Sequence, residues 1–202
     1  MPSLLANRAS YVVLTSPALR SQIDHERVAM VSAAADLTET RAPTARPTSR
    51  AVLHVGTINV FKLSPHFVPL HVQLAEQGGT VHVAGTGGDE QRFRDDAIEH
   101  RVAERFVWHG FVDDLRPLLT DAAVLSYPVA AFSYASSDKL IQESQACGLP
   151  VLLPRRAATA HLVRHGVTGW LAEDDDDFRR RLLAITHGEC ELPSPAEVRA
   201  AA

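Results

Sequence analysis

Apolar and polar positions alternate in two distinct patterns along most of the chain after Ala51. Short runs rich in Val and Leu predict buried strands, and the longer segments between them have the apolar spacing of helices that cover a sheet. The expected strands are VLHVG, TVHVAG, RFVWHG, AVLSYP, PVLLP and GWLA. The expected helices are SPHFVPLHVQLAEQ, DEQRFRDDAIEHRV, DDLRPLLTDA, SSDKLIQESQACG, TAHLVRHG and DDFRRRLLAITH. This alternation predicts an α/β fold, a Rossmann-like parallel sheet with helices on both faces.

The remaining sequence divides into shorter segments with other patterns. Two apolar runs near the start, Tyr11–Leu14 and Val28–Val31, flank a stretch that begins at Ser16 and Pro17, which predicts a small βαβ unit. A segment rich in Thr, Pro and Arg follows and has no apolar period, as expected of a linker. We expect the βαβ unit over residues 1–36, the linker over 37–50, the Rossmann-like domain over 51–188 and a flexible, polar tail over 189–202.

Composition narrows the class of protein. With 202 residues, 46% of them hydrophobic, the chain can bury the core of one domain. The formal net charge of -4 offers no basic face to a phosphate backbone, so nucleic acid is not an expected partner. No apolar run approaches the roughly 20 residues that span a bilayer. Cys147 and Cys190 suit neither a metal spacing nor a disulfide framework, so we expect a soluble, cytoplasmic protein.

Ligands of doubly wound sheets bind at the carboxyl ends of the strands, so the loops after the strands are the first places to search. Glycines follow the first two strands, in Gly56–Lys62 and in Gly85–Glu90. Each loop either lets the backbone approach a ligand closely or is an ordinary tight turn. GTGG does not follow the G-x-G-x-x-G pattern, which leaves a nicotinamide enzyme as a minor alternative.

The third loop carries an aromatic cluster of Trp108, His109 and Phe111 around Gly110. Such side chains could pack beside a flat base, or Trp108 and Phe111 could belong to the core.

The fourth loop gathers small polar and charged residues at the start of a helix. Ser136, Ser137 and Asp138 precede Lys139 in the first turn, and Glu143 follows one turn later. A cation at a helix N-terminus is unfavourable by a few tenths of a kcal/mol, which favours an anionic ligand beside it. The alternative is an exposed ion pair between Lys139 and Glu143, worth about 0.3 kcal/mol.

Two further groups of residues are considered as possible metal ligands. His161 and His165 lie one helical turn apart without a third ligand, which is more typical of surface residues than of zinc binding. The acidic run Asp174–Asp177 precedes an expected helix and is interpreted as its cap. We predict no metal site.

Several motifs together resemble the donor-binding C-terminal domain of GT-B glycosyltransferases of family 4, also called group 1. They are VLHVG, HVAGTGG, RFVWHGFVDDLRPLLTDAAVLSYP, KLIQESQACGLPVL and HLVRHGVTGWL. The resemblance implies transfer of a sugar, with retention, from a nucleoside diphosphate sugar to an unknown acceptor. It implies no cofactor besides the donor substrate, and a leaving diphosphate that is stabilised without a metal.

The resemblance also implies roles for individual residues. Glu143 matches a ligand of the ribose hydroxyls, while Lys139 and Lys62 match residues that face the diphosphate. The family's sugar-contacting glutamate corresponds to Ala135, and an arginine of its first loop corresponds to Thr57. We assign the donor site to Glu143, Lys139, Ser136, Ser137, Lys62, Gly56, Thr57, Gly85, Gly87, His109, Gly110 and Phe111, and we name no catalytic residue.

In the family an acceptor-binding N-terminal domain lines the other wall of the cleft, and residues 1–36 resemble only its last βαβ piece. We therefore expect a fragment or split enzyme that needs a partner chain, with self-association through the exposed strand edge as another possibility. The alternatives are a non-catalytic nucleotide-binding or nucleotide-sugar-binding module and a degenerate remnant without a ligand.

Overall fold

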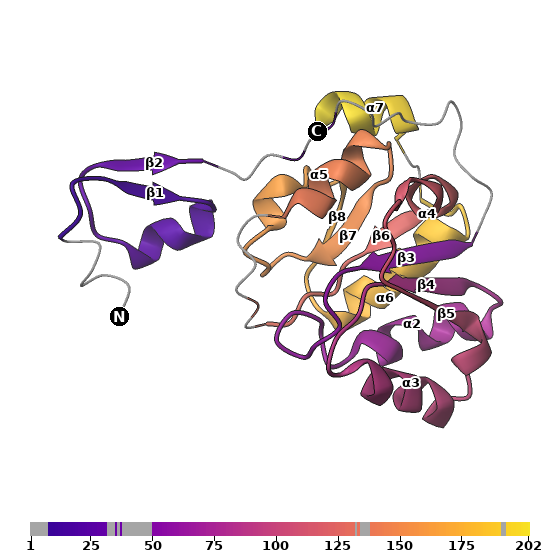
Figure 1. The fold of residues 1–202 in the computed structure, drawn as a ribbon. Helices are drawn as coiled ribbons and strands as arrows, with labels where there is room; N and C mark the ends of the chain where they lie inside the picture. The colour runs from indigo at the N-terminus through magenta and orange to yellow at the C-terminus, as the bar shows by residue number, and fades with distance from the viewer. Residues whose placement is uncertain are drawn as a thin grey trace.

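The main body of the molecule is a six-stranded, all-parallel sheet with the strand order β5-β4-β3-β6-β7-β8 (Figure 1). The computed structural model describes residues 8–31, 35, 37, 50–131, 133, 138–190 and 193–202. The strands are β3 (Ala51–Val55), β4 (Thr80–Ala84), β5 (Phe106–Gly110), β6 (Val124–Ser126), β7 (Val151–Pro154) and β8 (Gly169–Ala172). The chain adds β4 and β5 on one side of β3 and then adds β6, β7 and β8 on the other, so the order reverses between β3 and β6.

Helices cover both faces of this sheet, as the sequence predicts. One face carries α2 (Phe67–Glu76), α3 (Glu90–Glu99) and α6 (Asp175–Thr186), and the other carries α4 (Arg116–Asp121) and α5 (Lys139–Ala146). Adjacent strand residues point to opposite layers: Val52 packs in the core with Phe67 and Phe178, whereas Leu53 packs in the core with Ile141. The strands β3, β6, β7 and β8 are therefore largely buried on both faces, which explains their continuous apolar runs. The edge strand β5 differs, because Val107 and His109 are exposed.

The acidic run before α6 caps that helix, as predicted. The Asp174 side chain accepts a hydrogen bond from Asp177 N at 2.8 Å. Asp177 is itself buried and forms ion pairs with Arg180 and Arg181. Both carboxylates are thus engaged in holding the first turn of the helix.

The helix expected over TAHLVRHG is wrong, because only the short 3-10 helix η3 (Ala160–Leu162) forms there. Val163 is extended, and Thr168 Oγ1 accepts from Arg164 N at 2.9 Å. Gly166, at φ +77°, then turns the chain back toward β8. A turn that closes through a side-chain hydrogen bond competes here with helix formation.

The flexible tail expected over 189–202 is also wrong for its last ten residues, 193–202, where α7 (Pro195–Ala201) forms. Ser194 and Glu197 make a reciprocal capping box at its start. Val198 is fully buried, and Arg199 donates to Ala146 O at 2.7 Å at the end of α5. A capped helix with a buried apolar residue is docked on the domain.

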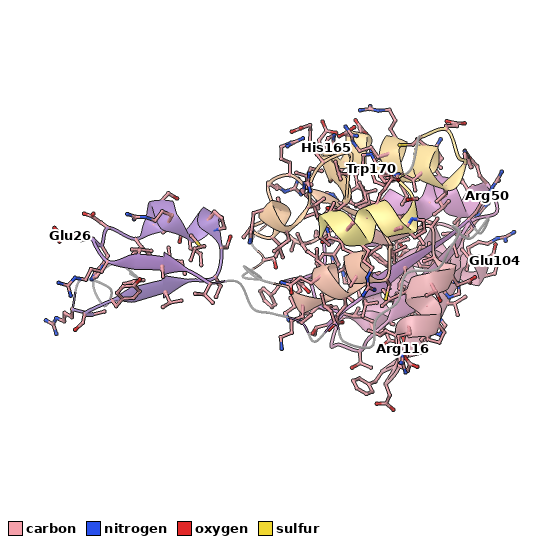
Figure 2. The ribbon with its side chains drawn as sticks, turned by 90° about the horizontal axis from the view of Figure 1, so that it is seen from above. Glu26, Arg50, Glu104, Arg116, His165 and Trp170 are labelled. Atoms are coloured by element: carbon pink, nitrogen blue, oxygen red, sulfur yellow. The ribbon has the colours of Figure 1, made fainter. Side chains whose placement is uncertain are left out.

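The N-terminal segment forms a separate two-stranded parallel sheet of β1 (Val12–Leu14) and β2 (Val28–Met30). The connection is the 3-10 helix η1 (Pro17–Gln22) rather than an α-helix. From above, this unit, with Glu26 labelled, lies to one side of the main body (Figure 2). Ser16 Oγ donates to Ala158 O of the main body at 2.7 Å. Of the expected linker, residues 38–49 lie outside the described part of the chain.

Among the described residues, no helix has the length and apolar character needed to cross a membrane.

Candidate functional site

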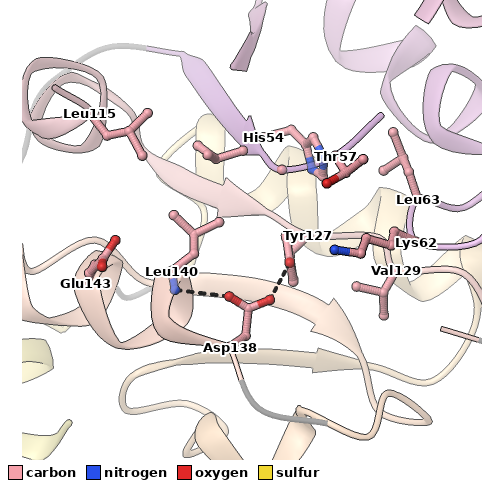
Figure 3. A pocket seen from close by; sticks show the side chains of 12 residues that line it. His54, Thr57, Lys62, Leu63, Leu115, Tyr127, Val129, Asp138, Leu140 and Glu143 are labelled. Atoms are coloured by element: carbon pink, nitrogen blue, oxygen red, sulfur yellow. Dashed lines mark hydrogen bonds between the residues drawn. The ribbon is translucent and has the colours of Figure 1, made fainter. Parts of the chain in front are cut away.

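A cavity of about 250 Å³ opens at the carboxyl ends of the strands, where the strand order reverses between β3 and β6 (Figure 3). In doubly wound sheets this switch point is the usual place for a ligand. Four of the residues assigned from the sequence line this first cavity: Gly56, Thr57, Lys62 and Glu143. They come from the loop after β3 and from α5, so the structure brings two predicted loops together.

A second cavity of about 280 Å³ lies beside the first. The walls of both cavities contain Val55, Gly56, Thr57 and Leu115. Gly85 and Phe111, both assigned from the sequence, line the second cavity. Phe111 is 77% exposed, so it does not belong to the core. The second cavity thus offers an aromatic ring beside aliphatic walls.

Backbone hydrogen bonds hold the loop that the two cavities share. Gly56 N donates to Ala84 O at 2.9 Å, and Ile58 N donates to Thr86 O at 3.1 Å. Glycines make this approach possible: a Cβ at Gly85 would lie 2.0 Å from Gly56 O, and one at Gly87 would lie 2.0 Å from Ile58 O. Gly87 lines neither cavity, so its role in this structure is close packing of two loops.

Lys139, His109 and Gly110 are not among the residues that line the two cavities. Lys139 is exposed at the start of α5, and the structure shows no ion pair between it and Glu143. The His109 ring stacks on His82, with His82 Nδ1 and His109 Nε2 2.8 Å apart on the outer strands. Gly110 only accepts a backbone hydrogen bond, from Gly85 N at 2.7 Å. Ser136 and Ser137 lie outside the described residues.

Trp108 is a core residue, which was one of the two alternatives from the sequence, and it lines neither cavity. It packs against the core beside Phe106, with ring centroids 6.1 Å apart. The guanidinium of Arg94 lies 4.9 Å from the centre of its ring. This is a cation–π contact that covers an edge of the sheet.

Three polar residues of the first cavity were not assigned from the sequence: His54, Tyr127 and Asp138. The Tyr127 hydroxyl donates a short hydrogen bond to Asp138. Asp138 also caps α5 by accepting from Leu140 N at 3.0 Å. Figure 3 shows this pair among the residues that line the cavity, with the Lys62 side chain extending toward Tyr127. The capping carboxylate therefore joins the start of α5 to the end of β6.

Burial of the side chains in the first cavity raises the pKa values of Tyr127 and Glu143. Burial, followed by the charge of Asp138, raises the pKa of Tyr127 above its usual range. Burial is also the largest cause of a raised pKa at Glu143, to which Asp138 adds and which Lys139 opposes. Two carboxylates thus lie in one partly buried space with the Lys62 cation.

His54 belongs to a buried polar network under the cavity. His54 Nδ1 lies 3.1 Å from Ser126 O, and His71 Nε2 lies 2.8 Å from Ser126 Oγ. Burial lowers the pKa of both histidines to about 4. Both rings are therefore neutral near pH 7. A histidine inside the apolar strand VLHVG is a signal in the sequence that could have indicated this network.

The candidate metal pair of the sequence is not assembled. His161 Nδ1 lies 2.9 Å from Ala158 O, while His165 Nδ1 accepts from Leu171 N at 3.0 Å. Across the described ranges, no group of three or more His, Cys, Asp or Glu side chains has a geometry that could hold a metal ion.

A parallel sheet of this strand order, covered by helices on both faces, defines a Rossmann-like domain. Residues 49–187 match the family model described as Glycosyl transferases group 1, so the chain belongs to this family. A comparison with curated protein sequences found no match.

Solved structures with the same fold agree with this assignment. HepE from Anabaena, in complex with UDP and glucose, has a TM-score of 0.79 at 18% identity, covering 98% of this chain and 60% of that one. A TarM mutant from S. aureus, in a complex that contains UDP, has a TM-score of 0.74 at 16% identity, covering 97% and 40%. The lipopolysaccharide outer core galactosyltransferase WaaB has a TM-score of 0.73 at 16% identity, covering 95% and 57%. The chain thus spans 40% to 60% of the length of these proteins, and the likeness confirms the Rossmann-like fold of a GT-B half.

Proposed function

We propose that this chain is the donor-binding domain of a glycosyltransferase that transfers a sugar from a nucleoside diphosphate sugar to an acceptor, with retention. The observation that carries the proposal is the pair of adjoining cavities at the switch point, with Glu143 in one and Phe111 in the other. Together they offer room for a base, a ribose and a sugar in a row. Family membership and the UDP complexes of HepE and TarM support the same ligand class.

The lining residues suggest how the donor would lie. The base would occupy the second cavity beside Phe111 and Leu115, where flat and aliphatic surfaces suit it. The ribose would bind Glu143, since a carboxylate offers two acceptor oxygens to neighbouring hydroxyls. The diphosphate would then pass the shared wall at Gly56 and Thr57, which are both small residues.

In this proposal the domain contributes to the reaction by stabilising the negative charge of the leaving nucleotide. Departure of the nucleotide leaves negative charge on the diphosphate, and fixed cations with helix N-termini stabilise such charge without a metal. Lys62 lines the first cavity and is the cation placed to do this. Lys139 belongs to the same proposal because it begins α5. Ser136 and Ser137 belong to it because they shortly precede Lys139 in the sequence.

The acceptor would bind on the other wall of the cleft, which we propose is supplied by a further domain or by a partner chain. That wall orients the acceptor hydroxyl and excludes water, which determines whether transfer or hydrolysis follows. A cytoplasmic location fits a donor of this kind and remains part of the proposal.

A second candidate function is a non-catalytic nucleotide-binding or nucleotide-sugar-binding module. The observation in its favour is the presence of Ala135 and Thr57 where the family resemblance places a glutamate and an arginine. Both candidates require nucleotide binding, and they differ in whether the donor is turned over. A remnant without a ligand would do neither.

Calorimetric titration with UDP, ADP and GDP tests the shared part of these proposals. Glu143→Ala should weaken binding of the preferred nucleotide by about 1 to 3 kcal/mol while the protein stays folded. Glu104→Ala is the matched control, because Glu104 is exposed just before β5. It therefore lies at the amino-terminal end of an edge strand, whereas the cavities lie at the carboxyl ends of the strands. Absence of binding at millimolar nucleotide would refute both candidates, and equal affinity of the Glu143→Ala protein would refute the ribose role.

Turnover separates the two candidates. Release of UDP from UDP-glucose, measured with and without candidate partner chains, is expected for a transferase. Tight binding without release under every condition would favour the binding module.

A further inference from the structure

His54 is a polar side chain buried within β3, directly below the first cavity. It is only 3% exposed. Its ring stacks on Tyr127 with centroids 5.7 Å apart and lies 5.2 Å from the Phe67 ring. A buried imidazole costs free energy unless its nitrogens find partners, so each nitrogen of this ring needs an account.

The geometry determines which nitrogen carries the proton. Nδ1 lies 3.1 Å from Ser126 O, which can only accept, so Nδ1 is the protonated nitrogen. Burial lowers the pKa of His54 to about 4, so the ring is neutral near pH 7. Nε2 is therefore a lone pair that can only accept a hydrogen bond.

Nε2 makes no hydrogen bond to any residue that the structure describes. Figure 3 shows the His54 ring beside Thr57 in the wall of the cavity. Gly56 keeps the space above the ring open, because a Cβ there would lie 3.9 Å from Nε2. His71 provides the contrast: its Nδ1 lies 2.6 Å from Phe67 O and its Nε2 lies 2.8 Å from Ser126 Oγ.

We propose that His54 is a specificity-determining residue whose Nε2 accepts a hydrogen bond from a hydroxyl group of the bound donor. This inference rests on the proposed function. A lone pair suits an O–H group and disfavours phosphate oxygens, which only accept near neutral pH. Asp138 and Glu143 are further acceptors in the same cavity, and they too suit hydroxyl groups of the donor. The hydroxyl belongs either to the ribose or to the transferred sugar.

The test compares two buried histidines that differ in their access to the cavity. Dissociation constants for UDP and UDP-glucose are measured with the wild-type chain, His54→Phe and His71→Phe. His54→Phe should weaken UDP-glucose binding about 3- to 10-fold, the usual range for one hydrogen bond, while His71→Phe should leave it unchanged. A loss confined to UDP-glucose assigns the hydroxyl to the sugar, and an equal loss for UDP assigns it to the ribose.

The wild-type protein supplies a second readout that needs no substitution. The nitrogen-15 chemical shift of His54 Nε2 should move when UDP-glucose binds, and those of His71 should not. A static His54 shift, a folded His54→Phe protein with unchanged affinities, or equal losses in both variants would overturn the assignment. A wild-type chain that binds neither ligand would overturn the proposed function as well, whereas the preceding outcomes leave that function intact.

Discussion

Gly87 and Gly88 are adjacent glycines between β4 and α3, and the same substitution should affect them in opposite ways. A Cβ at Gly87 would lie 2.0 Å from Ile58 O and 2.5 Å from the Ile58 carbonyl carbon. A Cβ at Gly88 would meet no atom within 4 Å. Neither residue has a φ in the left-handed range, so backbone strain does not distinguish them.

The cost of Gly87→Ala follows from what must move. Real Cβ atoms stay at least 3.0 Å from such neighbours, so Ile58 has to retreat by about 1 Å. Its side chain is fully buried, its N donates to Thr86 O at 3.1 Å and its O accepts from Asp89 N at 3.2 Å. Overpacking against a fixed backbone and a weakened hydrogen bond together predict a loss of about 2 to 4 kcal/mol. Gly88→Ala should be neutral or should stabilise the protein by up to about 1 kcal/mol.

Urea unfolding of the wild-type chain and both variants measures this difference, with unchanged m-values as the check that the free energies are comparable. The displaced loop also forms a wall of both cavities, so folded Gly87→Ala protein should bind UDP more weakly than Gly88→Ala protein. Equal stabilities of the two variants would refute the close approach of the loops. Equal affinities for UDP, with the stability loss intact, would refute its connection to the site.

Three further predictions follow from the buried histidines, α7 and the N-terminal strands. Folded His54 and His71 have pKa values lowered to about 4, so the unfolded chain takes up their protons first as the pH falls. Stability should therefore drop between about pH 6.5 and 4, by up to about 3 kcal/mol for each histidine, and a flat profile in urea unfolding would contradict this. Val198→Ala should cost about 1 to 2 kcal/mol because the side chain is fully buried, and a change below about 0.5 kcal/mol would mean that α7 is not docked. Val13 is 57% exposed on β1, so Val13→Lys should reduce any self-association seen by sedimentation, and association that persists would place the contact elsewhere.

The arrangement of the main sheet could be predicted because most of its strands are buried on both faces. Their apolar runs, alternating with amphipathic segments, leave few folds other than a covered parallel sheet. The docked α7 was missed although Ser194 and Glu197 form a capping box, because prolines and polar residues dominated the interpretation of the chain end. Whether Val198 finds an apolar surface depends on the end of α5, which the local pattern does not reveal.

The site was predictable only to the level of loops. Gly56, Thr57 and Glu143 follow from the rule that ligands bind at strand carboxyl ends, and all three line the first cavity. His109 was expected in such a loop but lies within β5, and the pleat of this edge strand directs its ring toward His82. The Tyr127–Asp138 contact joins two elements across the switch point, and no spacing within the sequence encodes that meeting.

The polar groups at the switch point are more than the fold needs, and this supports a ligand-binding role for the first cavity. Asp138 is sufficient to cap α5, yet burial and this second carboxylate together raise the pKa of Glu143. The same space holds an imidazole nitrogen of His54 without a partner among the described residues. Acceptors that face a cavity in this way can be satisfied by the hydroxyl groups of a bound ligand. Since the adjoining cavity beside Phe111 is largely apolar, the two spaces together match a molecule with one flat end and one hydroxylated end.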